Sequence, residues 1–277
     1  MSTESGGYAL SVVGPPGSGK SHLAFSATTL GKTVLFAAPM AELMSYRSGV
    51  EGLEAVPLVD EEWRPSERSF KSTAYGVLME KVRELEKRDD VKCVVFDTMS
   101  AGPSEAVWHN VLAGYGTDDP RELGGNSRQP YVTYASRMKE LLDRLDLMRF
   151  RKKCHLITLW HEDLREIEGL GTPRKETEKV GQDYKVFTKW DMGKLPLMYG
   201  SLRQDVQKWY DLAFFAEPVV GSNPFRCRLV PFPDATRLSK TRLRGFNAFL
   251  QTQKITEVPN DFPALLALIE KSQSGGK

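Results

Sequence analysis

The chain has 277 residues, of which 40% are hydrophobic and 27% charged. This balance is ordinary for a globular protein and excludes a wholly disordered, collagen-like or disulfide-stapled chain. The 38 basic and 36 acidic residues leave a net charge of +2, so a nucleic-acid site must be a local patch. No apolar run approaches the roughly 20 residues of a membrane span, and residues 1–7 hold no apolar signal core. We therefore expect a cytoplasmic protein with no membrane partner.

Apolar runs and amphipathic segments alternate along the chain. Four runs are typical of buried strands, and they lie at 8–13, 33–38, 92–96 and 156–159. Four segments are predicted as helices, at 21–30, 70–87, 132–148 and 262–271. This alternation predicts an α/β fold with a mostly parallel sheet and helices on both faces.

The remaining segments are less regular. Two apolar runs, 212–220 and 225–230, flank a Gly-Ser-Asn-Pro turn and predict a hairpin that extends the sheet antiparallel. Residues 40–68 give no assignment, and 100–130 contain Gly, Asp and Pro, which favours a long loop with some helix. The helix over 132–148 is expected to bury one face. That face is formed by Val132, Ala135, Met138, Leu142, Leu145 and Met148.

A phosphate-binding loop follows the first predicted strand. The residues Gly14-Pro15-Pro16-Gly17-Ser18-Gly19-Lys20-Ser21 match G-x-x-x-x-G-K-[ST] at every fixed position. Gly17 and Gly19 permit the tight backbone that aims N–H groups at phosphate oxygens, and the following helix adds its positive end. Lys20 brings a cation to the β- and γ-phosphates, while Ser21 offers a hydroxyl to Mg²⁺. The loop predicts binding of a nucleoside triphosphate with its metal.

A second metal-binding carboxylate is expected at the tip of a neighbouring strand. Four apolar residues, 93–96, end in Asp97, and Thr98 follows. An aspartate at this point also suits a helix cap. Beside a complete phosphate loop, the metal role for Asp97 is favoured.

In their order along the chain, five strings resemble a RecA-type ATPase core. They are Gly14–Ser21, Val94–Thr98, Leu156–Glu162, Trp209–Phe215 and Pro233–Arg242. The chain most resembles the small phage-encoded RecA-like proteins that are grouped with single-strand annealing recombinases, over roughly residues 8–250. Residues 1–7 would then be a disordered N-terminus and 251–277 a C-terminal helix and tail. The resemblance implies ATP and Mg²⁺ as cofactors, ATP hydrolysis, and a role in recombination or annealing. It also implies single-stranded DNA as a partner, a homo-oligomer with ATP at its interfaces, and a single-strand binding protein as a further partner.

The resemblance also implies residue roles. Lys20 and Asp97 act in catalysis, and His161 ends its strand where the family places a γ-phosphate sensor, although a histidine there also suits an ordinary polar cap. Lys240 and Arg242 fall where the family sends cations to a neighbour's ATP, a role for which a solvated basic turn is the alternative. The family's water-orienting Glu falls near Met40. Either hydrolysis is slow, or Glu42 serves as the base from a distorted loop.

The family binds DNA through the loops that follow its third and fourth core strands. Here the second of these, 163–200, is expected to be a mobile loop in which aromatic residues lie among the cations. The candidates are Arg174, Lys175, Lys179, Lys185, Lys189 and Trp190. Phosphates attract mobile cations and unstacked bases attract flat rings, which suits a single strand. Carboxylates within it dilute the field of this loop, among them Glu166, Glu168, Glu176, Glu178, Asp183 and Asp191. From these residues alone a solvated loop is equally expected, and the resemblance favours DNA.

Two other functions use the same phosphate loop. In a small-molecule kinase, 163–200 would be a substrate lid, although no cluster of arginines marks it as one. A nucleotide-switched interaction module with little hydrolysis would agree with the displaced glutamate. ATP turnover with single-stranded DNA, with a metabolite, or with neither separates the three hypotheses.

Overall fold

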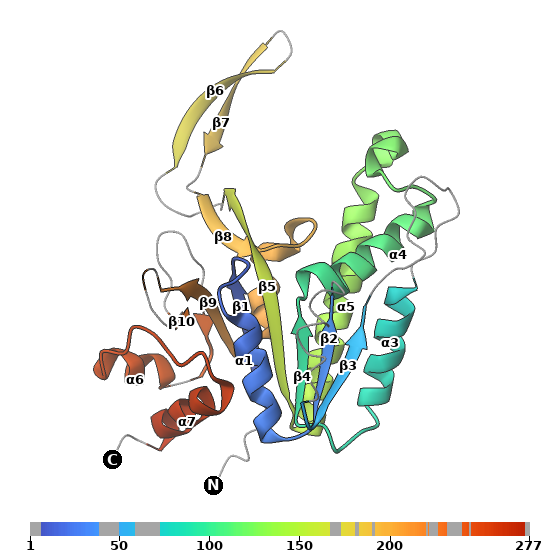
Figure 1. Cartoon of the computed structure of the whole chain (residues 1–277). Helices are drawn as coiled ribbons and strands as arrows, with labels where there is room; N and C mark the ends of the chain where they lie inside the picture. Colours follow the sequence, from blue (N-terminus) through green and yellow to red (C-terminus); the bar gives the residue numbers. More distant parts are fainter. Residues whose placement is uncertain are drawn as a thin grey trace.

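The structure is a computed structural model, and it describes residues 7–38, 50–58, 73–166, 173–180, 183–189, 192–219, 221, 227–231, 240–243 and 245–274. A nine-stranded sheet forms its centre, in the order β10-β9-β1-β5-β4-β2-β3, with β11 paired to β9 and β8 paired to β5 (Figure 1). The strands are β1 (Ala9–Gly14), β2 (Thr33–Ala37), β3 (Leu53–Pro57), β4 (Cys93–Asp97), β5 (His155–Glu166), β8 (Met192–Pro196), β9 (Leu212–Pro218), β10 (Cys227–Val230) and β11 (Lys240–Thr241).

The strands from β9 to β3 run parallel, and β10 and β11 pair antiparallel with β9. The α/β fold class expected from the sequence, with an antiparallel C-terminal extension, is therefore confirmed. Strand β1 lies between β5 and β9, so the loop that follows it opens near the middle of the sheet edge. That edge is where ligands of parallel sheets bind.

Helices cover both faces of the sheet, as expected. Alternate strand residues point to opposite faces, so Val94 and Phe96 join one core while Cys93 and Val95 join the other. The first core is covered by α3 (Ala74–Leu85), α4 (Glu105–Tyr115) and α5 (Gln129–Lys152). The second is covered by α1 (Lys20–Ser26), α6 (Phe246–Thr252) and α7 (Phe262–Gln273). Two buried layers thus hold the central strands in place.

The segment expected as a long loop, 100–130, is mostly helical. A π-helical turn over Ser100–Ser104 leads into α4, and a 3₁₀ stretch over Pro120–Asn126 leads into α5. Some of its Gly, Asp and Pro residues act at the ends of these helices. Gly116 ends α4 with φ of 67°, and the Asp119 side chain accepts a hydrogen bond from the Arg121 N–H.

Helix α5 buries a slightly different face from the predicted one. Val132 is 63% exposed, and Tyr134 is fully buried in its place. Tyr134 is favoured there because its hydroxyl lies 2.6 Å from Ser104 Oγ and its ring meets Trp108 edge-on. From Met138 onward the expected stripe is buried.

The segment 163–200 is not an irregular loop where the structure describes it. Strand β5 continues to Glu166 and pairs antiparallel with β8. Between them, β6 (Arg174–Val180) and β7 (Asp183–Lys189) form a separate two-stranded sheet that projects from the body (Figure 1). None of the helices in the described part of the chain is both long and apolar enough to cross a bilayer.

Candidate nucleotide-binding site

The phosphate loop joins the end of β1 to the start of α1. Gly17 and Gly19 have φ of 72° and 77°, the left-handed region that side chains rarely adopt. At Gly14 glycine is required by close packing, since a Cβ there would lie 2.5 Å from the Ala216 carbonyl oxygen. The glycines therefore allow both the turn and its close packing against β9.

Lys20 is folded back onto this loop. Its Nζ donates to the carbonyl oxygens of Gly14 at 2.8 Å and Pro15 at 2.7 Å, and to Ser18 Oγ at 3.3 Å. The residue is only 5% exposed, so these acceptors offset the cost of burying its charge. A phosphate oxygen would be a charged and therefore stronger acceptor at the same place.

A cavity of about 300 Å³ opens against the loop. Residues 16–21 line one side, and Asp97, Thr98 and His161 line the other. Strand β4 delivers Asp97, which is 1% exposed, and β5 delivers His161, which pairs with Gly14 in the strand register. The structure thus brings together four residues that the sequence singled out, namely Lys20, Ser21, Asp97 and His161.

His161 has an unusual environment. Its Nδ1 is buried and has no hydrogen-bond partner among the described residues. Burial lowers the pKa of this imidazole, the Lys20 charge lowers it further, and Asp97 opposes both effects. The His161 backbone N–H donates to Ser100 Oγ at 3.1 Å, and its carbonyl accepts from the Leu197 N–H at 2.8 Å. These effects favour the neutral form of the ring, whose Nδ1 has no partner in the described part of the chain. The backbone of His161 is held by hydrogen bonds to two other segments.

Other predicted residues do not meet this cavity. Glu42 and Trp190 lie outside the described residues, as does the Lys240 side chain. Arg242 has an exposed side chain, and its backbone N–H donates to the Asp211 carbonyl at the beginning of β9. Because β9 runs parallel to β1, Arg242 lies near the opposite end of the strands from the phosphate loop.

One contact of the site carries no signal in the sequence. Asn260 Nδ2 donates to the Gly19 carbonyl at 2.9 Å from 241 residues along the chain. This contact depends on tertiary packing that no local pattern indicates. Thr98 also lines the cavity, directly after Asp97 in the segment that the sequence marks.

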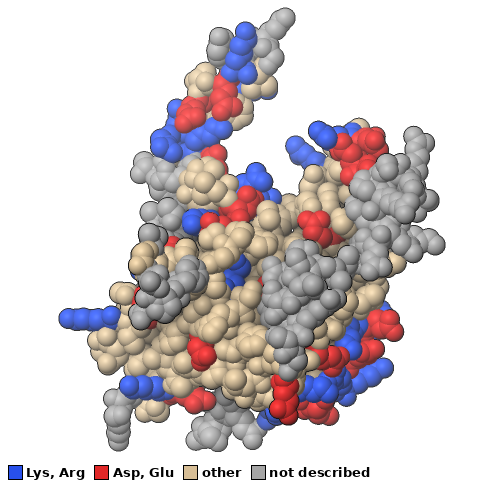
Figure 2. Space-filling view, viewed as in Figure 1, with Lys and Arg blue, Asp and Glu red and all other residues tan. Residues whose placement is uncertain are grey.

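The basic residues expected to bind DNA lie on the β6–β7 hairpin, which carries Lys and Arg together with acidic groups (Figure 2). Strand alternation separates them into two faces. One face holds no carboxylate among its described side chains, and it consists of Lys175, Thr177, Lys179, Val186 and Thr188. The other face carries both signs of charge, and its described side chains are those of Arg174, Glu176, Glu178, Val180, Lys185, Phe187 and Lys189. On the mixed face, Lys189 pairs with Glu178 at 2.9 Å.

The comparisons with known proteins assign no role to the residues of this site. The chain has the α/β architecture expected from its sequence, with a mostly parallel sheet and an antiparallel C-terminal extension. No protein-family model and no curated protein matches it. A solved structure described as the RadB recombinase matches 80% of this chain and 79% of its own chain, with 10% sequence identity and a TM-score of 0.38. A likeness of that size carries no weight for function, which rests on the site residues.

Proposed function

We propose that this chain is a Mg²⁺-dependent ATPase that binds single-stranded DNA, forms homo-oligomers and acts in DNA recombination or single-strand annealing. The observation that carries the ATPase is the meeting of Lys20, Asp97 and His161 around one cavity beside a complete phosphate loop. DNA binding draws on the projecting basic hairpin and on the resemblance to RecA-like proteins.

The cavity residues fit Mg–ATP. Loop N–H groups would bind the phosphates, and Lys20, which now donates to the Gly14 and Pro15 carbonyls, would donate to β- and γ-phosphate oxygens. The Ser21 hydroxyl and the Asp97 carboxylate would hold Mg²⁺, a cation that commonly takes one or two protein oxygens together with phosphate and water. When bound, the metal neutralises charge that develops on the transferring phosphoryl group.

His161 is proposed to sense the γ-phosphate. The His161 side chain lines the cavity, and an imidazole N–H there would donate to a phosphate oxygen. The backbone of the same residue contacts Ser100 and Leu197, which belong to the segments after β4 and β8. A change at the phosphate therefore reaches both segments through two hydrogen bonds.

The carboxylate-free face of the hairpin is the proposed surface for the phosphates of a single strand. Lys175 and Lys179 point from it to solvent, and Val186 supplies an apolar surface that is 64% exposed. An isolated two-stranded hairpin is only marginally stable, so a partner along one face would help to order it. On the other face, glutamates compete for the cations.

The position of Arg242 is the basis for proposing that the chain forms homo-oligomers. Its side chain is exposed and lies away from the cavity of its own chain. A cation there acts on ATP only across a subunit interface, as in the trans-acting role suggested by the resemblance. Glu42 is retained as the proposed water-orienting base.

ATP turnover with and without single-stranded DNA tests the proposal. We expect DNA to raise turnover, and Lys20→Ala to abolish it under both conditions. Lys208→Ala is the matched control, because the Lys208 side chain is 62% exposed and pairs with nearby Asp205. Turnover that saturating DNA leaves unchanged at low salt would refute the coupling. Turnover only with a nucleoside would select a kinase, and tight ATP binding without turnover would select a nucleotide-switched module.

A further inference from the structure

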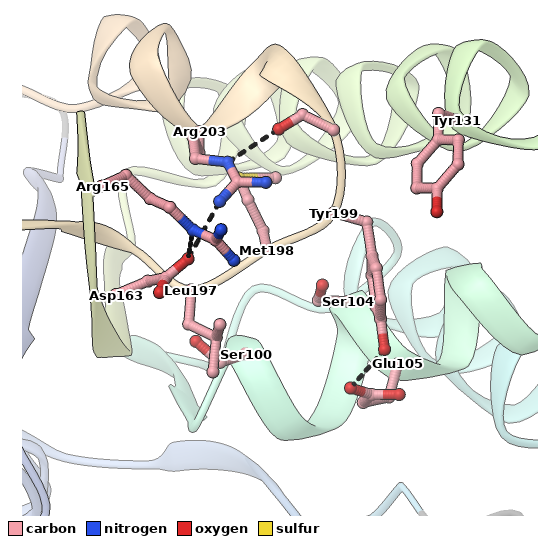
Figure 3. A pocket seen from close by; sticks show the side chains of 11 residues that line it. Ser100, Ser104, Glu105, Tyr131, Asp163, Arg165, Leu197, Met198, Tyr199 and Arg203 are labelled. Atoms are coloured by element: carbon pink, nitrogen blue, oxygen red, sulfur yellow. Dashed lines mark hydrogen bonds and ion pairs between the residues drawn. The ribbon is translucent and has the colours of Figure 1, made fainter. Parts of the chain in front are cut away.

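A second cavity has a volume of about 460 Å³, and Figure 3 shows the side chains that line it. Its lining comes from the segments after β4 and β8, from the beginning of α5 and from the outer part of β5. Ser100 connects the two cavities, because it lines the second one and its Oγ accepts the backbone N–H of His161. The volume is within the range of pockets that enclose small organic ligands.

One wall of this cavity is a flat aromatic ring. Tyr199 stacks on Trp108 with centroids 4.4 Å apart and planes 14° apart, and it meets Tyr134 edge-on at 5.5 Å. Its hydroxyl donates to Glu105 Oε1 at 2.9 Å. Figure 3 shows the ring nearly edge-on, with one face toward Ser104 and the arginines. A ring held from behind and at its tip is a rigid surface for stacking.

The opposite wall is polar and partly buried. Asp163 Oδ2 accepts from Arg165 Nε at 2.7 Å and from Arg203 Nη1 at 2.9 Å. Arg203 Nε also donates to the Gly200 carbonyl, and its side chain is only 19% exposed. Burial lowers the pKa of Arg203, and the like charge of Arg165 adds to this effect. Its other N–H groups have no further partner in the described part of the chain.

Charge and shape narrow the ligand to one class. Two arginines and two carboxylates, Asp163 and Glu105, face the cavity, so its formal charges cancel. That balance disfavours a free anion, which would need an excess of cations. A neutral, flat group with donors and acceptors along one edge satisfies both walls, and these are the properties of a nucleobase.

We propose that this cavity holds one unstacked nucleobase, with its face on Tyr199 and its edge on the Arg203–Asp163 pair. The base belongs to a bound strand or to a free nucleoside, and the strand source rests on the proposed function. Tyr131, which is 40% exposed, lies at the rim. This site is distinct from the hairpin, whose lysines attract phosphates of any sequence.

Binding of intact and base-free strands tests the proposal. Wild-type protein and Tyr199→Leu are titrated with an oligonucleotide and with a strand of equal length whose bases are replaced by abasic sites, and free nucleosides are added as competitors. Tyr199→Leu should weaken binding of the intact strand by about 5-fold to 150-fold, the loss expected for one stacked base, and leave the abasic strand unchanged. Tyr199→Phe should keep wild-type affinity.

Controls separate a local loss from a folding defect. Tyr115→Leu is the matched variant, because Tyr115 is 37% exposed and its hydroxyl pairs with Thr133 outside the cavity. Arg203→Gln and photocrosslinking of a 5-iodouracil strand to the wild-type protein do not require Tyr199→Leu to fold. Crosslinks to the peptide that contains Tyr199 or Tyr131 support the proposal, and crosslinks confined to the hairpin overturn it.

The arms also separate the two sources of the base. Tyr199-dependent binding of nucleosides, with intact and abasic strands bound equally weakly, supports a free nucleoside and counts against the proposed DNA function alone. If each ligand, strand or nucleoside, binds the wild-type protein, Tyr199→Leu and Arg203→Gln with the same affinity, the cavity proposal is overturned. The proposed DNA function is not affected by that result.

Discussion

Replacing Gly19 by alanine should destabilise the fold more than the same change at Gly17. Both residues have φ in the left-handed region, so each alanine costs roughly 1–2 kcal/mol of conformational energy. Only at Gly19 does the new Cβ collide, at 2.3 Å from Cys227 Sγ and 2.7 Å from its Cβ. At Gly17 nothing lies within 4 Å. Overpacking adds about 1–3 kcal/mol, so Gly19→Ala should lose roughly 2–5 kcal/mol in total.

Urea unfolding without nucleotide measures both variants, since a bound ligand would mask differences in the free energy of unfolding. Cys227→Gly removes the two colliding atoms, so combining it with Gly19→Ala should recover the overpacking part while the dihedral cost stays. A double-mutant cycle isolates this coupling. Equal losses of unfolding free energy for Gly17→Ala and Gly19→Ala, or no coupling with Cys227→Gly, would show that Cys227 of β10 does not pack against Gly19.

Three further outcomes are expected. Burial and the charge of Arg149 lower the pKa of His155 to about 4, and its Nδ1 accepts the Tyr8 N–H, so the folded state prefers the neutral ring. Its contribution to the free energy of unfolding is complete above pH ~6.5 and is lost toward pH ~4, by at most roughly 3 kcal/mol, and His155→Gln should flatten this part of a pH–stability curve. Lys175→Gln should reduce the salt dependence of strand binding by about 0.7 in log–log slope, and Lys185→Gln, beside glutamates, by less; equal slopes would contradict the assignment of faces. Leu265→Ala, on the buried side of α7, should cost about 2–5 kcal/mol in denaturant unfolding, and a loss below 1 kcal/mol would mean that α7 is not part of the core.

Much of the parallel core is predictable from the sequence, because each buried strand is an apolar run with a clear end. Strand β3 escaped prediction since it is an edge strand in which only Val56 is buried. The β6–β7 hairpin escaped for a related reason. Its β6 side chains are all exposed, so no alternation of apolar and polar residues marks it.

The nucleotide site was predictable where a local rule acts. The phosphate loop has a fixed spacing, and Asp97 and His161 each follow an apolar run that reaches the same sheet edge. Asp97 ends β4, whereas His161 was expected to end its strand and lies inside β5, which continues to Glu166. Asn260, Tyr199 and Arg203 follow no such rule. They reach their places through packing between segments that are far apart in the chain, which a single sequence does not display.

The Asn260 contact ties the far end of the chain to the start of α1. Asn260 holds the Gly19 carbonyl, and two residues later the Phe262 N–H donates to Ser26 Oγ at 2.7 Å. Whatever stiffens the phosphate loop should therefore also slow hydrogen exchange at the Phe262 amide and protect α7 from carboxypeptidase. Digestion from the C-terminus would then report nucleotide occupancy without a label on the nucleotide.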